Sequence, residues 1–336
     1  MGRPTLVSLA NELGVSRQTV SNVINAPHLV KPETRKRVQR AIEESGYRPN
    51  RAAQSLRNQC ANALAMRIYP SSDGIYGAVM DRFHHRLVSQ AHEIGYNIIP
   101  ITAEDDRDEL QQLVALHERG SIDGCLLSGT DEGDERPAGL RRHKVPMVSF
   151  GRPWGQDEQE HFWVDVDGAS ATAEAVRHLA SHGHRRIGFV GMNPGSGPGD
   201  DRRAGWRAAM EELDAADPDE LDSRGRDTVQ TGRESAKTLA ERGATAFVCA
   251  SDSLAFGALL ETRQLLRSDS GSLPVIGYDD TAVAQALGMS SVTQPVDEAV
   301  RLLLETLVAQ LDNPDAPVPE PVLLQGTLQI RRLLSA

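Results

Sequence analysis

The spacing of apolar residues changes about sixty residues into the chain. Up to that point leucine, valine and isoleucine recur every three or four positions, and glycine or proline interrupts the pattern. This spacing is typical of amphipathic helices and predicts three short ones within residues 5–45. Ser16 is expected to cap the second helix, and Pro32 suits the first turn of the third. The pattern therefore predicts a small all-α head.

From residue 62 onward, short apolar runs alternate with amphipathic stretches. Such alternation is typical of a parallel, doubly wound sheet. The runs are too many for one economical sheet, so we expect an α/β domain of two lobes, with a ligand site at the carboxyl ends of the strands. The acidic stretch 214–228 is expected to be a solvated loop. The predicted strands are 63–68, 97–101, 124–127, 145–150, 186–190, 245–250, 273–276, 291–293 and 322–325, and the predicted helices are 76–94, 107–118, 168–181, 202–213, 232–241 and 253–266.

The charge of the chain divides at the same place as the apolar spacing. The whole sequence of 336 residues has a formal net charge of −11, but residues 1–60 carry ten basic and four acidic side chains. The other residues carry 26 basic and 43 acidic ones. A basic segment joined to an acidic one predicts that the head binds a polyanion and that the body does not.

The composition disfavours several other classes of protein. No stretch approaches the roughly 18 consecutive apolar residues of a membrane span, and the first residues lack the apolar segment of a secretory signal. The three cysteines match no metal-binding spacing. We therefore expect a cytoplasmic protein that neither holds a metal nor contacts a membrane.

A glycine-rich run at 195–201 stands between a predicted strand and a predicted helix, as a dinucleotide-binding loop would. Asp200 occupies the position of the third glycine of that motif, and the pair Asp200-Asp201 would repel a pyrophosphate. We therefore expect a flexible loop at the edge of a cleft, and no cofactor.

Two predicted helices joined by a turn at Gly14 form the helix-turn-helix plan. In that plan the second helix enters the major groove of DNA and presents its first residues to the base edges. With its apolar residues facing the core, the exposed side of this helix carries Arg17, Gln18, Ser21 and Asn22. Arginine pairs with guanine, and glutamine or asparagine pairs with adenine. The alternative is a three-helix bundle whose polar face is merely solvated.

Residues 5–57 resemble the head of the LacI/GalR family of transcriptional regulators. The resemblance rests on Gly14-Val-Ser16, Thr19-Val-Ser21, Gly46-Tyr-Arg-Pro-Asn50 and Ala52-Ala-Gln-Ser-Leu56. It implies a helix-turn-helix domain at 1–49 and a hinge helix with linker at 50–61. Asn22 stands where many relatives carry arginine, which would shift the preferred base toward adenine. The phosphate contacts expected are Ser16, Thr19, Asn25, Lys31, Thr34, Arg35, Arg51 and Arg57.

The implied hinge helix at 50–58 is too short to persist alone in water. It is expected to fold when two copies pack together on the operator. The resemblance implies that Leu56, with Ala53, then enters the minor groove, where an apolar wedge opens a flexible base step and bends the duplex. The alternative for Leu56 is an ordinary linker residue.

Residues 62–336 resemble the effector-binding domain of the same family, which has the periplasmic-binding-protein-like fold. The motifs that carry the resemblance include Val164-Asp-Val-Asp-Gly168, Ala250-Ser-Asp-Ser-Leu254 and Val275-Ile-Gly-Tyr-Asp279. The resemblance implies a homodimer, an N-terminal lobe of about 62–162 and 294–322, and a C-terminal lobe of about 163–293 and 323–336.

The resemblance places Arg202 and Asp279 against the effector, with Ser251 where asparagine is frequent. A guanidinium and a carboxylate on opposite walls can grip sugar hydroxyls through charge-assisted hydrogen bonds. Strand ends add Asp73, Tyr76, Thr130, Arg152 and Trp154 as candidates, and the lobe crossover adds Gln294. The structural alternatives are an exposed helix-start residue for Arg202, a helix cap for Asp279, a packing role for Trp154 and a hinge role for Gln294.

The expected function is that of a transcriptional repressor. A homodimer would bind a pseudo-palindromic operator, and a small-molecule effector, expected to be a carbohydrate, would change DNA affinity through lobe closure. Only 4% of the residues are aromatic, which favours a sugar over a stacked purine. The alternatives are a solute-capture protein for a transporter and a sugar hydrolase with Asp73 and Asp279 as its carboxylate pair.

Overall fold

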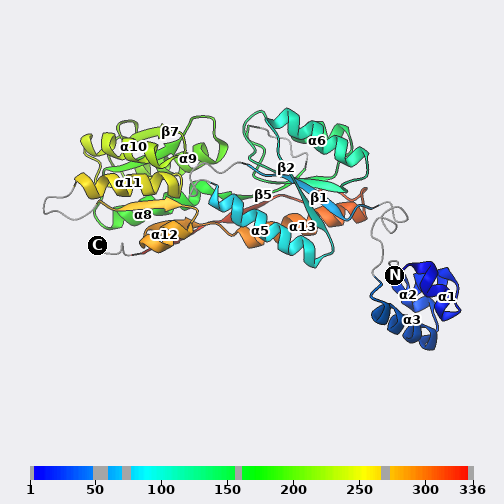
Figure 1. The fold of residues 1–336 in the computed structure, drawn as a ribbon. Coiled ribbons are helices and arrows are strands. Elements are labelled where there is room, and N and C mark those ends of the chain that lie inside the picture. The colour runs from blue at the N-terminus through cyan, green and yellow to red at the C-terminus, as the bar shows by residue number, and fades with distance from the viewer. Residues whose placement is uncertain (1–3, 48–59, 70–76, 156–160, 266–272, 332–336) are drawn as a thin grey trace. The chain divides into compact units, whose positions relative to one another are not determined.

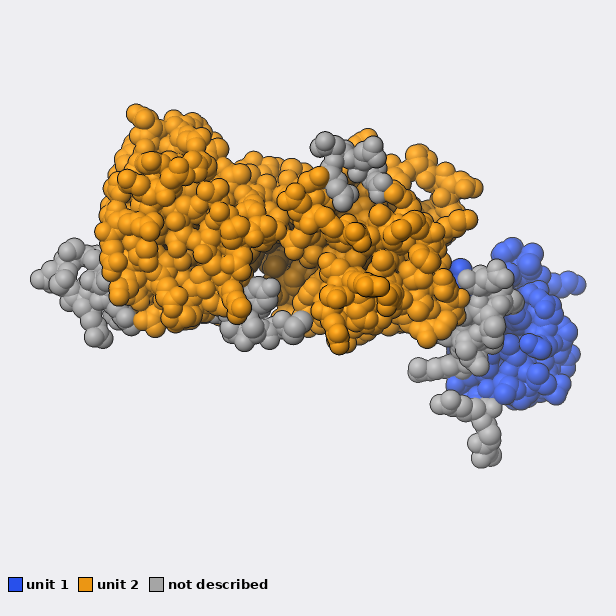
Figure 2. Space-filling model, turned by 90° about the horizontal axis from the view of Figure 1, so that it is seen from above, with its two compact units in different colours: residues 1–60 blue, residues 61–336 orange. Residues whose placement is uncertain are grey.

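The computed structural model describes residues 4–47, 60–69, 77–155, 161–265 and 273–331. The chain forms two compact units, Met1–Cys60 and Ala61–Ala336 (Figure 2). Each unit has its own hydrophobic core. The division falls where the apolar spacing and the charge of the sequence change.

The first unit consists of short helices with local caps. Thr5 and Ser8 form a reciprocal capping box at the first helix, and the Ser16 hydroxyl accepts a hydrogen bond from the backbone N–H of Thr19. Gly14 ends the first helix in the left-handed conformation, with a φ of 61°. The three predicted helices are confirmed. The elements are α1 (Leu6–Leu13), α2 (Arg17–Asn25), a 3-10 turn (Pro27–Leu29) and α3 (Pro32–Ser45).

The core of the first unit is one small apolar cluster. Leu9, Val20, Val38 and Tyr47 are each less than a tenth exposed, and they come from all three helices and the segment after α3. Helix α2 packs against both α1 and α3. One face of α2 is therefore fixed against the rest of the unit, and the opposite face is left for solvent or a partner.

The second unit contains two six-stranded sheets, one in each lobe (Figure 1). The strand order is β11-β5-β4-β3-β1-β2 in the first lobe and β12-β10-β9-β8-β6-β7 in the second. In the described sheets every neighbouring pair is parallel except β10 with β12. The strands of the first sheet are β1 (Ala63–Arg67), β2 (Asn97–Ile101), β3 (Gly124–Ser128), β4 (Met147–Phe150), β5 (Phe162–Asp167) and β11 (Val322–Gln325); those of the second are β6 (Ile187–Met192), β7 (Asp222–Gly225), β8 (Ala246–Cys249), β9 (Val275–Tyr278), β10 (Ser290–Thr293) and β12 (Thr327–Gln329).

Helices cover both faces of the first sheet, as a parallel sheet requires. Every residue of β1 is buried, because Leu64 faces the helix layer of α5 and α13 while Ala65 faces that of α6 and α7 (Figure 1). The first-lobe helices are α5 (Ala78–Glu93), α6 (Asp106–Glu118), α7 (Arg136–Arg142) and α13 (Val296–Asp312); the second-lobe helices are α8 (Gly168–Ser181), α9 (Gly197–Glu212), α10 (Val229–Glu241), α11 (Asp252–Leu265) and α12 (Ala282–Leu287).

The chain crosses between the lobes after β5, before α13, and between β11 and β12. The first and last crossings fall later than predicted, because β5 and β11 pair with each other in the first sheet, with Val322 opposite Val164. The expected lobe limits at 162 and 322 are therefore wrong by one short strand each.

The sequence pattern did not predict several elements that have few consecutive apolar residues. The expectation of a solvated loop at 214–228 is wrong, because β7 lies within it as an edge strand of sequence Asp-Ser-Arg-Gly. The glycine-rich run is not a flexible loop either, since Gly197–Asp201 form the first turn of α9 and Ser196 caps it. The elements β5, β12, α7, α12 and α13 also have no counterpart in the predicted set.

Candidate DNA-binding and effector-binding sites

The exposed face of α2 carries three of the four side chains expected to contact bases. Arg17 and Gln18 are exposed, and Asn22 is half-buried. The Gln18 amide Nε2 donates to the Asn22 Oδ1 at 2.8 Å, so one side chain orients the other. Ser21 is only 8% exposed, because it lies beside Val20 at the edge of the face that meets the core. The prediction that Ser21 lies on the exposed side is therefore wrong.

Residues expected to contact phosphates gather at a shallow depression beside the starts of α2 and α3. The Ser16 and Thr19 hydroxyls lie 2.9 Å apart. Lys31 is exposed and gives α3 no side-chain cap. Backbone N–H groups at two helix starts together with a lysine suit an anion. The depression is lined by Val15, Ser16, Thr19, Asn22, Leu29, Val30, Lys31 and Thr34.

Several other predicted residues are described in part or not at all. Arg35 lies in the first turn of α3 and is half-buried. The hinge helix at 50–58 lies outside the described residues, so it stays a prediction. The same holds for the predicted roles of Arg51, Ala53, Leu56, Arg57, Asp73 and Tyr76, and for the side chain of Asn25.

In the second lobe, the carboxyl ends of the parallel strands β6 to β9 meet at one edge of the sheet. Arg202, on α9, is 8% exposed. Its NH1 donates to the Ala250 carbonyl at 2.6 Å, and its guanidinium lies 3.7 Å from the centroid of the Tyr278 ring. Its Nε is buried with no hydrogen-bond partner among the described residues. Arg202 is therefore not an exposed helix-start residue, and one of its donors is left over.

Asp279 follows β9 with a φ of 108°, a conformation that is uncommon for a residue with a Cβ. Its Oδ1 accepts a hydrogen bond from Gln294 Nε2 at 2.7 Å. Burial raises the pKa of the Asp279 carboxyl to about 7, although the nearby Arg202 guanidinium opposes the rise. Thr281, not Asp279, caps α12. The helix-cap alternative for Asp279 is therefore wrong.

Gln294 links Asp279 to the crossover before α13. Its side chain bonds Asp279, and its carbonyl accepts a hydrogen bond from Arg82 NH2 of α5 at 2.5 Å. The residue is 5% exposed. Gln294 thus lies at the crossover and contacts Asp279, which is itself a predicted effector residue, while its own contact with an effector stays a prediction.

Ser251 and Asp252 lie at the start of α11, directly after β8. The Ser251 hydroxyl accepts a backbone N–H of the first helical turn at 3.2 Å and donates to Asp227 Oδ1. Asp252 is 1% exposed and accepts hydrogen bonds from Thr281 N–H and the Ser291 hydroxyl, both at 2.7 Å. Burial raises the pKa of Asp252 to about 6. Asp252 therefore ties neighbouring connections together beneath the site.

The first-lobe candidates are bonded to other protein groups. The Thr130 hydroxyl donates to the Arg152 carbonyl at 2.9 Å. Arg152 Nε donates to Asp165 Oδ2 at 2.6 Å, and its guanidinium lies 4.5 Å from the centroid of the Trp154 ring. These side chains hold the loop after β4 in place.

Contacts between the lobes converge on the start of α9. The Gly197 N–H donates to Asp131 Oδ1 at 3.1 Å. A Cβ at Gly197 would lie 2.3–2.4 Å from three atoms of the Trp154 indole, so the indole packs directly on the glycine. Arg152 NH2 lies 3.5 Å from Asp201 Oδ2. Arg152 and Trp154 thus both contact the opposite lobe, which favours the packing alternative for Trp154.

Sequence reasoning missed Asp131 and Asp227 at this surface. Asp131 follows β3 next to the predicted Thr130, so its position after a strand was a usable signal. Asp227 follows β7, which was not recognised as a strand. The rule that polar residues after parallel strands face a ligand could therefore not be applied to it.

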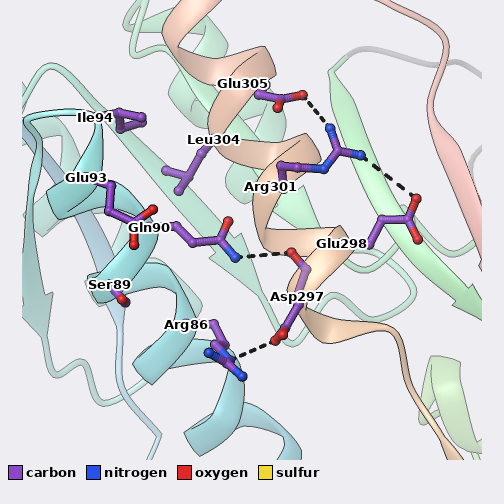
Figure 3. A pocket seen from close by; sticks show the side chains of 10 residues that line it. All are labelled: Arg86, Ser89, Gln90, Glu93, Ile94, Asp297, Glu298, Arg301, Leu304 and Glu305. Carbon is purple, nitrogen blue, oxygen red and sulfur yellow. Dashed lines mark hydrogen bonds and ion pairs between the residues drawn. The ribbon is translucent and has the colours of Figure 1, made fainter.

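A separate groove of about 550 Å³ lies between α5 and α13 (Figure 3). Arg86 Nε lies 2.8 Å from Asp297 Oδ1, and Arg301 NH1 lies 2.8 Å from Glu305 Oε2. Two helices form this groove, whereas loops after strands form the inter-lobe site. Most of its charged side chains are paired with one another.

Metal and membrane functions find no support in the described part of the chain. No group of three or more His, Cys, Asp or Glu side chains there is arranged to hold a metal ion. None of the described helices combines the length and the apolar character that crossing a bilayer demands.

Comparisons with known proteins agree with both units. The model for bacterial regulatory proteins of the lacI family matches residues 5–50, and that for the periplasmic binding protein-like domain matches residues 176–332. The chain is 31% identical over 324 residues to the HTH-type transcriptional regulator CelR of Thermobifida fusca, which covers 93% of this chain and 94% of that one. It is 28% identical to the HTH-type transcriptional regulator AscG of Escherichia coli, over 94% of each chain.

Solved structures lead to the same class. A complex of transcriptional regulator CelR with cellobiose is 29% identical, with a TM-score of 0.72 over 98% of this chain and 99% of that one. The lac repressor dimer bound to operator and an anti-inducer, at 22% identity and a TM-score of 0.81 over both full chains, shows the likeness of fold.

A helix-turn-helix unit joined to a two-lobed binding-protein fold defines a DNA-binding regulator. The chain belongs to the LacI family of bacterial transcriptional regulators. Its relatives are regulators and not enzymes, so the hydrolase alternative is excluded.

Proposed function

We propose that this regulator is a repressor whose affinity for operator DNA is controlled by a sugar bound between the two lobes. The observation that carries the proposal is the polar wall of the second lobe. There Arg202 of α9 contacts Ala250 and Tyr278, the residues that precede Ser251 and Asp279, and its Nε has no hydrogen-bond partner among the described residues. The proposed effector residues are Thr130, Arg202, Ser251, Asp279 and Gln294, with Asp73 and Tyr76 as further candidates; Arg152 and Trp154 are assigned to contacts between the lobes.

A sugar suits this wall because it presents many hydroxyls that both donate and accept. The Asp279 carboxylate would accept hydrogen bonds from sugar hydroxyls. The Arg202 Nε–H, which has no partner among the described residues, would donate one to a hydroxyl or ring oxygen. The structure of the relative CelR with cellobiose supports the sugar class and makes cellobiose the first probe.

The first unit is proposed to read the operator through α2. Arg17, Gln18 and Asn22 would contact bases in the major groove. A homodimer would place two DNA-binding units on a pseudo-palindromic operator, and it would do so in the cytoplasm, where the DNA lies. The structure of the lac repressor dimer bound to operator, a protein of the same fold, supports the dimer on DNA. Leu56 and Ala53 would enter the minor groove, and the proposed phosphate contacts are Ser16, Thr19, Asn25, Lys31, Thr34, Arg35, Arg51 and Arg57.

Effector control is proposed to act through lobe closure. The Asp131–Gly197 hydrogen bond, the packing of Trp154 on Gly197 and the Arg152–Asp201 ion pair all depend on how the lobes meet. A sugar that binds both walls changes the equilibrium between closed and open lobes. This change alters the operator affinity of the DNA-binding units through the chain that joins them to the lobes.

The test begins with a thermal-shift screen of the full-length protein against neutral mono- and disaccharides, including cellobiose, phosphorylated sugars and purines. Each compound that raises the Tm is then added to a binding assay with an operator selected from random DNA. We expect a neutral sugar to raise the Tm and to weaken operator binding. Stabilisation by phosphorylated sugars or purines, and never by a neutral sugar, would overturn the proposal.

A further inference from the structure

The chain from the DNA-binding unit enters the second unit at Ala61. Ala61 is half-buried and packs against the apolar cluster on the α6 and α7 side of the first sheet. Strand β1 begins two residues later, at Ala63. Any influence that the joining chain carries between the lobes and the DNA-binding unit therefore passes through Ala61, and the groups that hold this residue decide how firmly the chain is attached.

Asp123 holds the entering chain through its side chain and its backbone. Its Oδ1 accepts the Ala61 N–H at 2.7 Å, and its Oδ2 accepts the Ala63 N–H at 3.2 Å. Its own N–H donates to the Ala63 carbonyl at 2.8 Å. Hydrogen bonds to an ionised acceptor are stronger than those between neutral groups. Asp123 cannot shift easily either, because the preceding Ile122 is 2% exposed in the core.

The conformation of Asn62 lets one carboxylate reach both N–H groups. Asn62 has a φ of 49°, in the left-handed region that asparagine enters more readily than most residues. The chain turns there, so the N–H groups on either side of Asn62 converge on Asp123. The Asn62 carbonyl in turn accepts the N–H of Asn97 at the start of β2, at 2.9 Å. The entering chain is therefore bonded to the residues that begin two neighbouring strands.

Strand β3 connects this attachment to the proposed effector site. Asp123 directly precedes β3, a buried strand of five residues between β1 and β4. Beyond the other end of β3 lie the proposed effector residue Thr130 and Asp131, which accepts the Gly197 N–H of the opposite lobe. One short strand thus has the attachment of the joining chain at its amino end and a contact between the lobes beyond its carboxyl end.

We infer that Asp123 couples operator affinity to the state of the lobes by anchoring the joining chain to β3, an inference that rests on the proposed control by a sugar. With the anchor, lobe closure moves the point from which the DNA-binding unit is held. Without it, the chain has more freedom, and operator binding costs more conformational entropy. The ligand-free protein then loses operator affinity, and the response to sugar becomes smaller. Asp123 is a positioning residue, because it acts through the chain that it holds.

The experiment compares full-length wild type and Asp123→Ala in three measurements. These are operator affinity without sugar, operator affinity with saturating cellobiose, and cellobiose affinity without DNA; if cellobiose does not bind, the neutral sugar with the largest Tm shift replaces it. The ratio of operator affinities without and with sugar is expected to fall at least about threefold, because the ligand-free protein binds operator more weakly. Sugar affinity should stay within about twofold of the wild type, since the effector residues lie at the opposite ends of the strands.

Asp105→Ala is the matched control. The carboxylate of Asp105, also in the first lobe, accepts the Asp108 N–H at 2.8 Å, but this bond caps α6 and holds no part of the joining chain. The control should lower the Tm and keep the wild-type ratio of operator affinities. Asp123→Asn, which keeps one acceptor oxygen, should give a ratio between those of the wild type and Asp123→Ala, and it decides the question if Asp123→Ala does not fold.

A lower Tm with an unchanged ratio of operator affinities in the Asp123 variants would make the residue structural only. This result would overturn the inference and leave the sugar proposal standing. So would an equal loss of sugar affinity, because the substitution would then act on the effector site itself. If no neutral sugar changes operator binding by the wild type, the proposed function and this inference fail together.

Discussion

The two units hold their recognition residues in different ways. On α2, Arg17 and Gln18 are exposed, and the packing of the opposite helix face sets their positions. In the second unit, Arg202 and Ser251 are less than a tenth exposed, and each is bonded to a neighbouring loop. A residue of the first kind can be exchanged without disturbing the fold. A residue of the second kind contributes to stability and recognition together, and the predictions below test this difference.

Arg202→Ala is expected to have the largest effect, because it removes a proposed contact with the sugar and also contacts that stabilise the fold. Sugar affinity should fall at least about 100-fold, as expected when a buried charged donor is lost. The free energy of unfolding should fall by about 2 kcal/mol, because the Ala250 carbonyl loses its donor and the Tyr278 ring loses its cation. Calorimetry with the screened sugar and urea unfolding measure the two effects.

Arg207→Ala serves as the control for Arg202→Ala. Arg207 lies on the same helix and pairs with Glu211 and Asp219 at the surface. It should leave sugar affinity unchanged and alter stability by less than about 1 kcal/mol. If Arg202→Ala lost stability but bound sugar like the wild type, the guanidinium would be structural only.

Arg17→Ala is expected to act on operator binding alone. Loss of one bidentate base contact costs about 1–3 kcal/mol, so operator affinity should fall between about fivefold and 150-fold. The Tm should stay within about 1 °C of the wild type, since Arg17 is exposed and supports no other element. Arg40→Ala, which removes an exposed arginine of α3, is the control. Selection of the wild-type operator consensus by Arg17→Ala would contradict the assignment.

The helical unit could be predicted almost completely from the sequence. Its apolar residues recur at helical spacing, and Ser16 and Gly14 mark helix ends by their own chemistry. Ser21 shows the limit of the pattern. A small hydroxyl side chain can be buried at the edge of a helix face that packs on the core. The polar–apolar pattern counts such a residue as exposed and therefore underestimates the width of the buried face.

The effector site could be predicted only where a motif or a recognised strand pointed to it. Arg202 and Asp279 follow from the resemblance, but Asp227 depends on β7, a four-residue edge strand without an apolar run. The roles of Arg152 and Trp154 depend on what the opposite lobe presents to them. That partner is Gly197 with Asp201, which are far away in the sequence and brought close only by the fold.

The pH dependence of unfolding should reveal the raised pKa of the Asp279 carboxyl. Its pKa is about 7 in the folded protein, against an ordinary value of 3.8. Between these values the folded protein holds a proton that the unfolded chain has released, so the free energy of unfolding falls as the pH rises from about 4 through about 7. Between pH 5 and 7.5 the Tm of the wild type should fall by a few degrees more than that of Asp279→Asn.

Asp315→Asn, which alters an exposed carboxyl, should instead follow the wild-type profile. Parallel profiles for Asp279→Asn and the wild type would show that the Asp279 carboxyl titrates normally. They would also remove the contrast between a buried site in the second unit and an exposed one in the first.

The smallest effect is expected for the ion pair that joins the lobes. Arg152 NH2 and Asp201 Oδ2 are 3.5 Å apart and partly exposed, so their coupling should be about 1 kcal/mol. A double-mutant cycle of Arg152→Gln and Asp201→Asn should show this coupling in sugar affinity, because the pair forms only when the lobes meet. The matched cycle of Arg152→Gln with Asp165→Asn lies within the first lobe and should show its coupling in the free energy of unfolding. Coupling in sugar affinity for the Asp165 cycle but not for the Asp201 cycle would assign Arg152 to the ligand rather than to lobe closure.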